Sequence, residues 1–163
     1  MDNAKQILHE LLTICRQYTK VDDDLYTDNE KNLVKIVWAI NDKLSIQIGK
    51  EYITTMLKEN TSHMIIVYTC ITSSTQKLFQ ELTNYEIELF NINELQFNIT
   101  KHVLVPKHTK LSKHDTLEFT KRFGKKIPIM LVSDPIAKVY NYKKDDIIKI
   151  IRPRNEISYR ICK

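Results

Sequence analysis

The stretch "HMIIVYTCITSSTQKLFQEL", residues 63–82, decides the fold predicted for this chain. Its first nine residues form a nearly unbroken apolar run, which is typical of a strand covered on both faces. Thr72, Ser73 and Ser74 follow with the side-chain oxygens that cap the N-terminus of a helix. The stretch therefore predicts a buried strand that leads directly into a helix.

The neighbouring sequence repeats this alternation. Residues 33–40 and 85–92 are rich in the β-branched and aromatic residues that favour strands. Residues 48–60 carry apolar side chains in helical register, and residues 44–48 fit either a strand or the start of that helix. The succession of strand, helix, strand, helix and strand predicts an α/β layer with a parallel or mixed sheet.

Two further segments precede this layer. Residues 3–19 carry an apolar stripe with helical spacing and predict a helix. The acidic residues 21–30 predict a turn-like loop between that helix and the first strand of the layer.

From Asn93 onward the alternation of strands and helices no longer continues. Residues 111–123 predict a helix that Ser112 caps, with Leu117 and Phe119 facing inward. Residues 145–153 and 156–163 predict a hairpin, and Pro135 begins a short helix before it. We therefore expect two domains, an α/β domain over residues 1–92 and a small α+β domain over residues 93–163.

Composition narrows the class of protein. The chain has 163 residues, with 42% hydrophobic and 28% charged residues, which is ordinary for a globular protein of one large or two small domains. No run approaches the ~20 apolar residues of a membrane span, and the N-terminus has no secretory-signal pattern. Cys15, Cys70 and Cys162 are odd in number and far apart, which predicts free thiols in a reducing compartment.

Charge is divided unevenly along the chain. Residues 1–90 hold 9 basic and 13 acidic residues, whereas residues 91–163 hold 16 basic and 7 acidic residues. The basic half predicts either a solvated surface or one that meets an acidic partner or nucleic acid.

The sequence contains none of the common catalytic motifs, such as a nucleophile elbow, a P-loop or a zinc-protease helix. The carboxylates at Asp145 and Asp146 precede a strand and predict a solvated turn. His102 and His108 would lie ~20 Å apart along one extended segment at about 3.3 Å per residue, which disfavours a shared metal ion. We interpret these histidines as packed or partner-facing side chains.

The basic half contains tyrosines, so we ask whether its aromatic and basic residues form a nucleic-acid-binding pattern. Its lysines are scattered, and no repeat of aromatic and basic residues matches a sequence-reading module. The N–H groups at Thr72, Ser73 and Ser74 offer a phosphate site at a helix N-terminus, although an ordinary helix cap explains the same residues.

Residues 98–112, "NITKHVLVPKHTKLS", carry a motif of known spacing. They match Asn-Ile-Thr, a histidine, Leu-Val-Pro and a second histidine in that order. A second motif spans residues 134–140 and 147–153, and the chain closes on Ser-Tyr-Arg-Ile at 158–161. Over residues 90–163 the sequence resembles the shared fifth subunit of eukaryotic RNA polymerases I, II and III, whose C-terminal domain is similar to a small subunit of archaeal RNA polymerase.

The resemblance implies a non-catalytic subunit of a DNA-directed RNA polymerase, with no cofactor, metal or small-molecule substrate and no membrane contact. It implies that the N-terminal domain is a nuclease-like jaw beside downstream duplex DNA, contacting the DNA backbone weakly. The C-terminal domain would be an assembly domain on the largest subunit and neighbouring small subunits. The implied location is the nucleus, or a viral factory or virion if the gene is viral.

The resemblance also implies two sets of site residues. The partner-binding set is His102, Leu104, Val105, Pro106, Lys107, His108, Asp134, Pro135, Ala137, Tyr140, Arg152 and Tyr159. The DNA-proximal set is Thr72, Ser73, Ser74 and Lys77.

The N-terminal half matches more weakly, and the chain is shorter than the family pattern between its first helix and Leu33. Two alternatives therefore stay open. A degenerate nuclease would need an acidic-x-Lys pair to hold Mg²⁺, and residues 33–42 and 63–71 contain none. A stand-alone nucleic-acid adaptor is the other alternative.

Overall fold

The computed structural model describes all residues, 1–163, as two compact units, Met1–Phe97 and Asn98–Lys163. The division lies five residues after the boundary expected from the sequence. The short turn at Ile92–Leu95 belongs to the first unit because Leu95 is buried there and Gln96 accepts a hydrogen bond from Asn3. With this division, the second unit holds 16 basic and 6 acidic residues.

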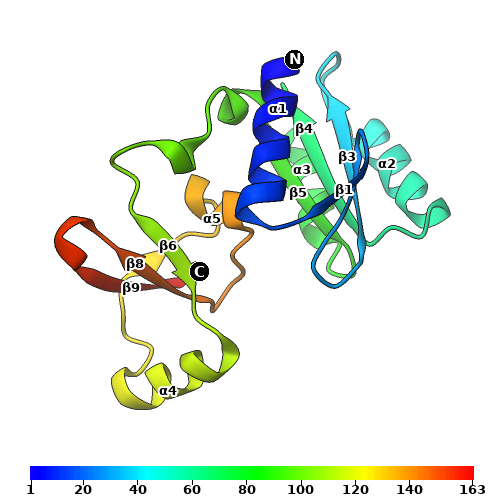
Figure 1. The fold of residues 1–163 in the computed structure, drawn as a ribbon. Coiled ribbons are helices and arrows are strands. Elements are labelled where there is room, and N and C mark those ends of the chain that lie inside the picture. Colours follow the sequence, from blue (N-terminus) through cyan, green and yellow to red (C-terminus); the bar gives the residue numbers. More distant parts are fainter. The chain divides into compact units, whose positions relative to one another are not determined.

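The first unit contains a five-stranded sheet in the order β1-β2-β3-β4-β5 (Figure 1). β1 (Thr19–Asp22), β2 (Leu25–Thr27) and β3 (Leu33–Ala39) are antiparallel, whereas β4 (His63–Tyr68) and β5 (Glu86–Asn91) continue the sheet in parallel. Of the two predicted arrangements, parallel or mixed, the sheet has the mixed one.

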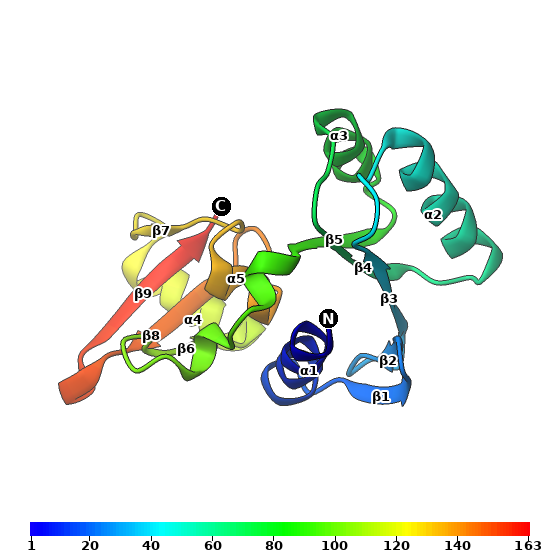
Figure 2. The same cartoon turned by 90° about the horizontal axis from the view of Figure 1, so that it is seen from above.

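Helices cover both faces of this sheet. α2 (Ile46–Lys58) and α3 (Ser73–Glu81) lie on one face, while α1 (Asp2–Glu10) and its π-helical extension to Cys15 lie on the other (Figure 2). β4 is buried over five of its six residues, and its alternate side chains turn to opposite faces. Its unbroken apolar run is thus explained by two helical layers.

One prediction for the first unit needs correction, and one alternative left open is now decided. Residues 21–30 were expected to form a loop, but β1 and β2 form a hairpin at the edge of the sheet. Tyr26 on β2 holds the hairpin there because its ring is buried and its hydroxyl lies 2.9 Å from Nδ1 of His9. Residues 44–48 fit a strand or the start of a helix, and the structure shows the helix, since α2 begins at Ile46. Leu44 makes a single bridge to Ile71.

The second unit contains a four-stranded sheet in the order β6-β8-β9-β7. The predicted hairpin is confirmed as β8 (Ile147–Ile151) paired with β9 (Ile157–Cys162). β6 (Lys107–Lys110) flanks it antiparallel to β8, and β7 (Ile129–Met130) lies parallel to β9.

Two helices complete this unit, α4 (Lys113–Phe123) and α5 (Pro135–Tyr140). α5 packs on the sheet through Ile136 and Ala137, against Ile148, Ile150 and the buried Cys162. α4 begins at the predicted Ser112 cap but buries no residue, and Leu117 is 63% exposed rather than turned inward. Phe119 contacts Tyr159 instead, with ring centroids 4.6 Å apart.

None of the helices has both the length and the apolar character that crossing a membrane requires. Cys15, Cys70 and Cys162 are all free thiols.

Candidate interaction surfaces

A cavity of about 250 Å³ opens on the second unit beside the start of α5. We call it the basic pocket, and its lining residues are Pro106, His108, Met130, Asp134, Ile136, Ile150, Arg152 and Arg160. Four of them belong to the predicted partner-binding set, although they come from three separate segments of the sequence. The fold thus brings the two motifs and the hairpin together at one place.

Strand register explains this convergence. His108 on β6 lies opposite Ile150 on β8, and Ile150 lies opposite Ser158 on β9, so these side chains share one face of the sheet. Arg160 lies two residues beyond Ser158 and therefore joins the same face. Asp134 approaches from the loop before α5, where its carboxylate accepts a hydrogen bond from the Ile136 N–H at 2.9 Å.

His108 is half-buried in the basic pocket. Its Nδ1 lies 2.8 Å from the carbonyl oxygen of Pro106, and because a carbonyl can only accept, Nδ1 carries the proton. Burial lowers the pKa of His108, and the nearby Arg160 and Arg152 lower it further, which outweighs the opposing effects of the Pro106 carbonyl and Asp134.

We expect the His108 ring to be neutral at pH 7, with the proton on Nδ1. An NMR titration of its ring resonances should give a midpoint below the ordinary value of 6.5. Since the folded pKa is depressed, the unfolded chain binds the proton first. The free energy of unfolding should therefore decrease through His108 as the pH falls below about 6.5. A midpoint above that value would contradict the arrangement.

The other predicted partner-binding residues are divided among different environments. Leu104 is 81% exposed at a turn where His102 accepts a hydrogen bond from the Leu104 N–H. Ala137 is fully buried in the core, so it packs inside the unit and cannot meet a partner directly. Tyr159 lies against Phe119 of α4 and not in the basic pocket.

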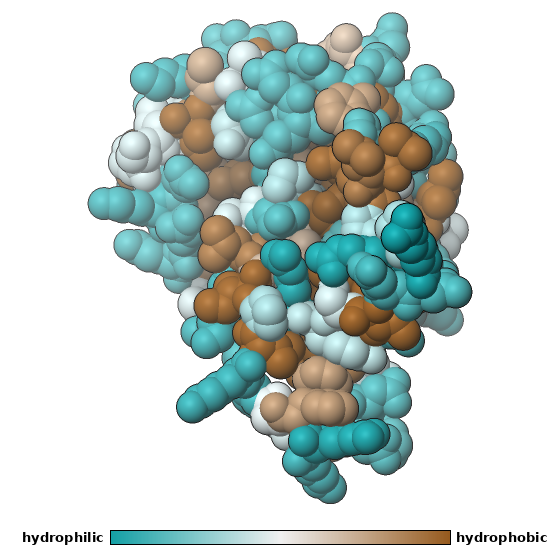
Figure 3. All heavy atoms as spheres, turned by 90° about the vertical axis from the view of Figure 1, so that its left-hand side faces the viewer, coloured by the Kyte–Doolittle hydropathy of each residue, from teal (hydrophilic) through white to brown (hydrophobic).

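Eight large apolar side chains reach the surface of the second unit. The exposed ones are Val103, Leu104, Leu117, Phe123, Ile129, Leu131, Val132 and Ile157. Figure 3 shows apolar side chains coming to the surface in patches between hydrophilic ones. Exposed apolar patches of this kind are typical of surfaces that bind another chain.

The DNA-proximal set lies at the start of α3. Ser73, Ser74 and Lys77 are exposed. Thr72 is the helix cap: its hydroxyl oxygen accepts from the Thr75 N–H at 3.3 Å and lies 2.7 Å from the buried Thr75 hydroxyl. The capping role accounts for the presence of Thr72, whereas the side chains of Ser73, Ser74 and Lys77 are exposed to a ligand.

Replacing Thr72 with alanine should lower the free energy of unfolding by about 1–2 kcal/mol, since the helix loses its cap and the Thr75 hydroxyl loses a partner. Urea denaturation measures this cost. The matched variant Ser73→Ala removes an exposed hydroxyl from the same turn and should change stability by less than about 0.5 kcal/mol. Equal effects of the two variants would contradict the capping role.

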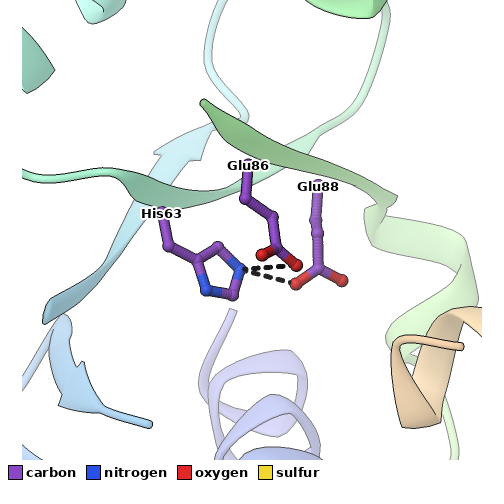
Figure 4. A group of neighbouring side chains, drawn as sticks. All are labelled: His63, Glu86 and Glu88. Atoms are coloured by element: carbon purple, nitrogen blue, oxygen red, sulfur yellow. Dashed lines mark hydrogen bonds and ion pairs between the residues drawn. The ribbon is translucent and has the colours of Figure 1, made fainter. Parts of the chain in front are cut away.

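A buried ionic cluster lies on the α1 face of the first sheet. Arg16 contacts both carboxylate oxygens of Glu88, at 2.6 and 2.7 Å. Nε2 of His63 lies 2.7 Å from Glu88 and 3.8 Å from Glu86 (Figure 4). Burial alone would raise the pKa of Glu88, but the Arg16 guanidinium and the His63 hydrogen bond lower it to about 2.

This cluster offers three possible metal ligands, His63, Glu86 and Glu88, with ligand atoms within 4.8 Å of one another. Arg16 already occupies both oxygens of Glu88, and a cation there would meet the positive guanidinium at close range. The geometry therefore favours a structural ion network over a metal site.

An open cavity of about 550 Å³ beside the β1–β2 hairpin gathers Asp22, Asp23, Asp24, Lys35 and Glu59, with Leu25, Leu33 and Thr61. Four of these five charged residues have local side-chain partners. Asp23 pairs with Lys20 at 2.9 Å, Asp24 accepts from the Trp38 indole at 2.7 Å, and Lys35 pairs with Glu59. These charged side chains therefore serve contacts within the hairpin and between the sheet and the end of α2.

Sequence reasoning missed Arg160, Met130, Ile136 and Ile150 in the basic pocket. A signal for Arg160 existed, because alternation along residues 156–163 sets it on the face of Ser158. The three apolar residues have no such signal, since a core position and a pocket floor look alike in sequence.

Comparison with known proteins gives one family. A model described as "RNA polymerase Rpb5, C-terminal domain" matches residues 97–162. The chain is 30% identical over 146 residues to "DNA-directed RNA polymerases I, II, and III subunit rpabc1" of Dictyostelium discoideum, covering 83% of this chain and 74% of that protein. It is 28% identical over 145 residues to the subunit RPABC1 of Caenorhabditis briggsae, covering 83% and 69%.

A viral protein is also similar. The chain is 35% identical over 115 residues to "Putative DNA-directed RNA polymerase subunit 454R" of Invertebrate iridescent virus 6, covering 59% of this chain and 62% of that one. Among solved structures, "Structure of EndoMS in apo form" gives a TM-score of 0.38 at 17% identity, over 54% of this chain and 43% of that one. A likeness that distant carries no argument about function.

Proposed function

This chain belongs to the Rpb5/RPABC1 family of DNA-directed RNA polymerase subunits, and from that premise we propose that it is a non-catalytic subunit that joins a polymerase through its second unit. The second unit docks on the largest subunit beside neighbouring small subunits. The first unit forms part of a jaw along downstream duplex DNA.

The observation that carries the proposal is the surface of the second unit. Eight large apolar side chains are exposed on 66 residues that also hold 16 basic and 6 acidic groups. A free-standing domain gains nothing from leaving so much apolar surface in water. Burial against a large assembly explains both the apolar patches and the positive charge.

Affinity purification of the full-length tagged chain from cells that contain its polymerase tests this proposal. We expect the two largest polymerase subunits to co-elute with it in stoichiometric amounts after nuclease treatment. Recovery of the chain with nucleic acid and without those subunits would support the stand-alone adaptor instead.

The proposal for the first unit concerns phosphate contact at the start of α3, where Ser73, Ser74 and Lys77 are exposed. The contact is to the backbone, so it gives no sequence preference. The unit otherwise carries an acidic balance, and the free chain should bind DNA poorly.

Replacing Lys77 with alanine in the assembled polymerase should lower the slope of log K against log salt for duplex DNA by about 0.9, the value for one phosphate contact. Filter binding or fluorescence anisotropy at several salt concentrations measures the slope. Lys58→Ala, at the exposed end of α2, is the matched control and should leave the slope unchanged. Tight sequence-specific binding by the free chain would contradict the jaw proposal.

The proposed location follows from the proposed assembly. A chain that serves a cellular polymerase works in the nucleus, and one encoded by a virus works in the viral factory or the virion. Immunofluorescence against the largest subunit distinguishes these locations by co-localisation.

A further inference from the structure

The basic pocket has two guanidinium groups with no acidic partner. Arg152 donates to the Ser158 hydroxyl at 2.8 Å, and Arg160 donates to the Ile129 carbonyl at 3.4 Å. Neither group has a carboxylate within 4.0 Å, and neither donates a further side-chain hydrogen bond. Each guanidinium has five N–H donors in a rigid fork, so most of these donors have no protein acceptor.

The pocket already contains one carboxylate, and its role is local. Asp134 uses one oxygen to cap α5 and does not reach either arginine at ion-pair distance. With His108 neutral, two arginines against one aspartate leave the lining with a net positive charge. One additional carboxylate from a ligand would therefore neutralise the charge of this pocket.

The apolar residues that line the pocket limit the kind of ligand that can bring this carboxylate. Met130, Ile136 and Ile150 are buried, and Pro106 is a further apolar lining residue. An apolar floor under two guanidinium groups fits the methylenes and the carboxylate of one acidic side chain. A volume of about 250 Å³ suits one side chain better than a nucleotide, and Asp134 would repel a doubly charged phosphate.

We propose that the basic pocket receives an aspartate or glutamate side chain of the largest polymerase subunit, which Arg152 and Arg160 bind together. This inference rests on the proposed function, because it names the chemistry of the docking contact. It adds Arg160 to the partner-binding residues and leaves Tyr159 outside the pocket.

Charge reversal of the two arginines in the full-length chain tests the proposal. We expect Arg152→Glu and Arg160→Glu each to lower co-purification of the largest subunit at least about tenfold, since two carboxylates would then face each other at the contact. Lys125→Glu makes the same charge change in the exposed loop after α4 and should co-purify like the wild type. Circular dichroism of each free variant verifies that it folds.

Carbodiimide coupling identifies the occupant. Arg160→Lys keeps the positive charge and supplies an amine, which carbodiimide joins to a neighbouring carboxylate as an amide with loss of water to the reagent. In the assembled polymerase, mass spectrometry should find residue 160 linked to an aspartate or glutamate of the largest subunit. Reversing that acidic residue to lysine should then restore co-purification of Arg160→Glu.

Two results would overturn the inference and leave the proposed function intact. One is normal co-purification of folded Arg152→Glu and Arg160→Glu, and the other is coupling of residue 160 only to Asp134 of the same chain. Two further results would overturn the proposed function, and the inference with it. One is loss of the wild-type association on nuclease treatment, because nucleic acid would then hold the complex, and the other is absence of the wild-type chain from the polymerase.

Discussion

Replacing Glu88 with alanine is expected to destabilise the first unit by about 3–5 kcal/mol, which is the usual cost of removing one partner of a buried ion pair. The side chain of Arg16 is only 3% exposed and would keep its charge without a counterion. Urea denaturation followed by circular dichroism measures the change. The matched control is Glu86→Ala on the same strand and face, whose side chain is 38% exposed and should cost less than about 1 kcal/mol.

A double variant separates the charge from the packing. Arg16→Met combined with Glu88→Leu removes both charges and keeps apolar volume, so it should be less destabilising than Glu88→Ala alone. Equal destabilisation by Glu88→Ala and Glu86→Ala would contradict the ionic role of Glu88.

The same cluster predicts a dependence on pH. The folded pKa of Glu88 is about 2 against an ordinary value of 4.5, so its carboxylate binds a proton more readily in the unfolded chain. Its contribution is therefore complete above about pH 4.5 and is lost as the pH falls toward 2. The wild type should lose about 3 kcal/mol more than Glu88→Ala across this interval. Parallel stability curves for the two proteins would refute the assignment.

Truncating Ile148 to alanine is expected to cost about 2–5 kcal/mol, because its side chain is fully buried at the centre of the second unit. A unit of 66 residues buries a small core and has little stability in reserve. Hydrogen exchange should show loss of protection within residues 98–163 and little change in β3, β4 and β5. Co-purification with the polymerase should fall in parallel.

Ile157→Ala is the control for this variant. It removes the same atoms from a side chain that is 52% exposed on β9, and it should cost less than about 1 kcal/mol. A similar loss of protection in both variants would mean that the second unit has no dominant core at Ile148.

The sequence predicted those elements whose signals are local. Residues 63–82 predicted a buried strand, a helix cap among Thr72, Ser73 and Ser74, and a helix. Each was confirmed, with Thr72 as the cap, because apolar runs and capping oxygens act over a few residues. The hairpin at residues 19–27 was missed because its acidic turn obscures a short strand anchored by one buried tyrosine. The prediction that Leu117 faces inward was wrong, because helical spacing indicates which residues share a face but not whether another element covers that face.

The candidate sites divide in the same way. The family motifs pointed to His108, Asp134 and Arg152, and the fold brings these three to one pocket. The contact between Arg16 and Glu88 had no local signal, since 72 residues separate its partners. Tertiary packing alone creates such pairs, so no periodicity or spacing rule could have predicted this one.

That separation also affects how the chain is made. Arg16 leaves the ribosome 72 residues before Glu88, and synthesis at about 5–20 residues per second takes roughly 4–15 seconds over that interval. During this time the Arg16 cation has no counterion, because Glu88 on β5 has not yet been made. Nascent chains of the first unit therefore complete their fold late, when residues near 91 become available, and until then they depend on whatever shields that cation.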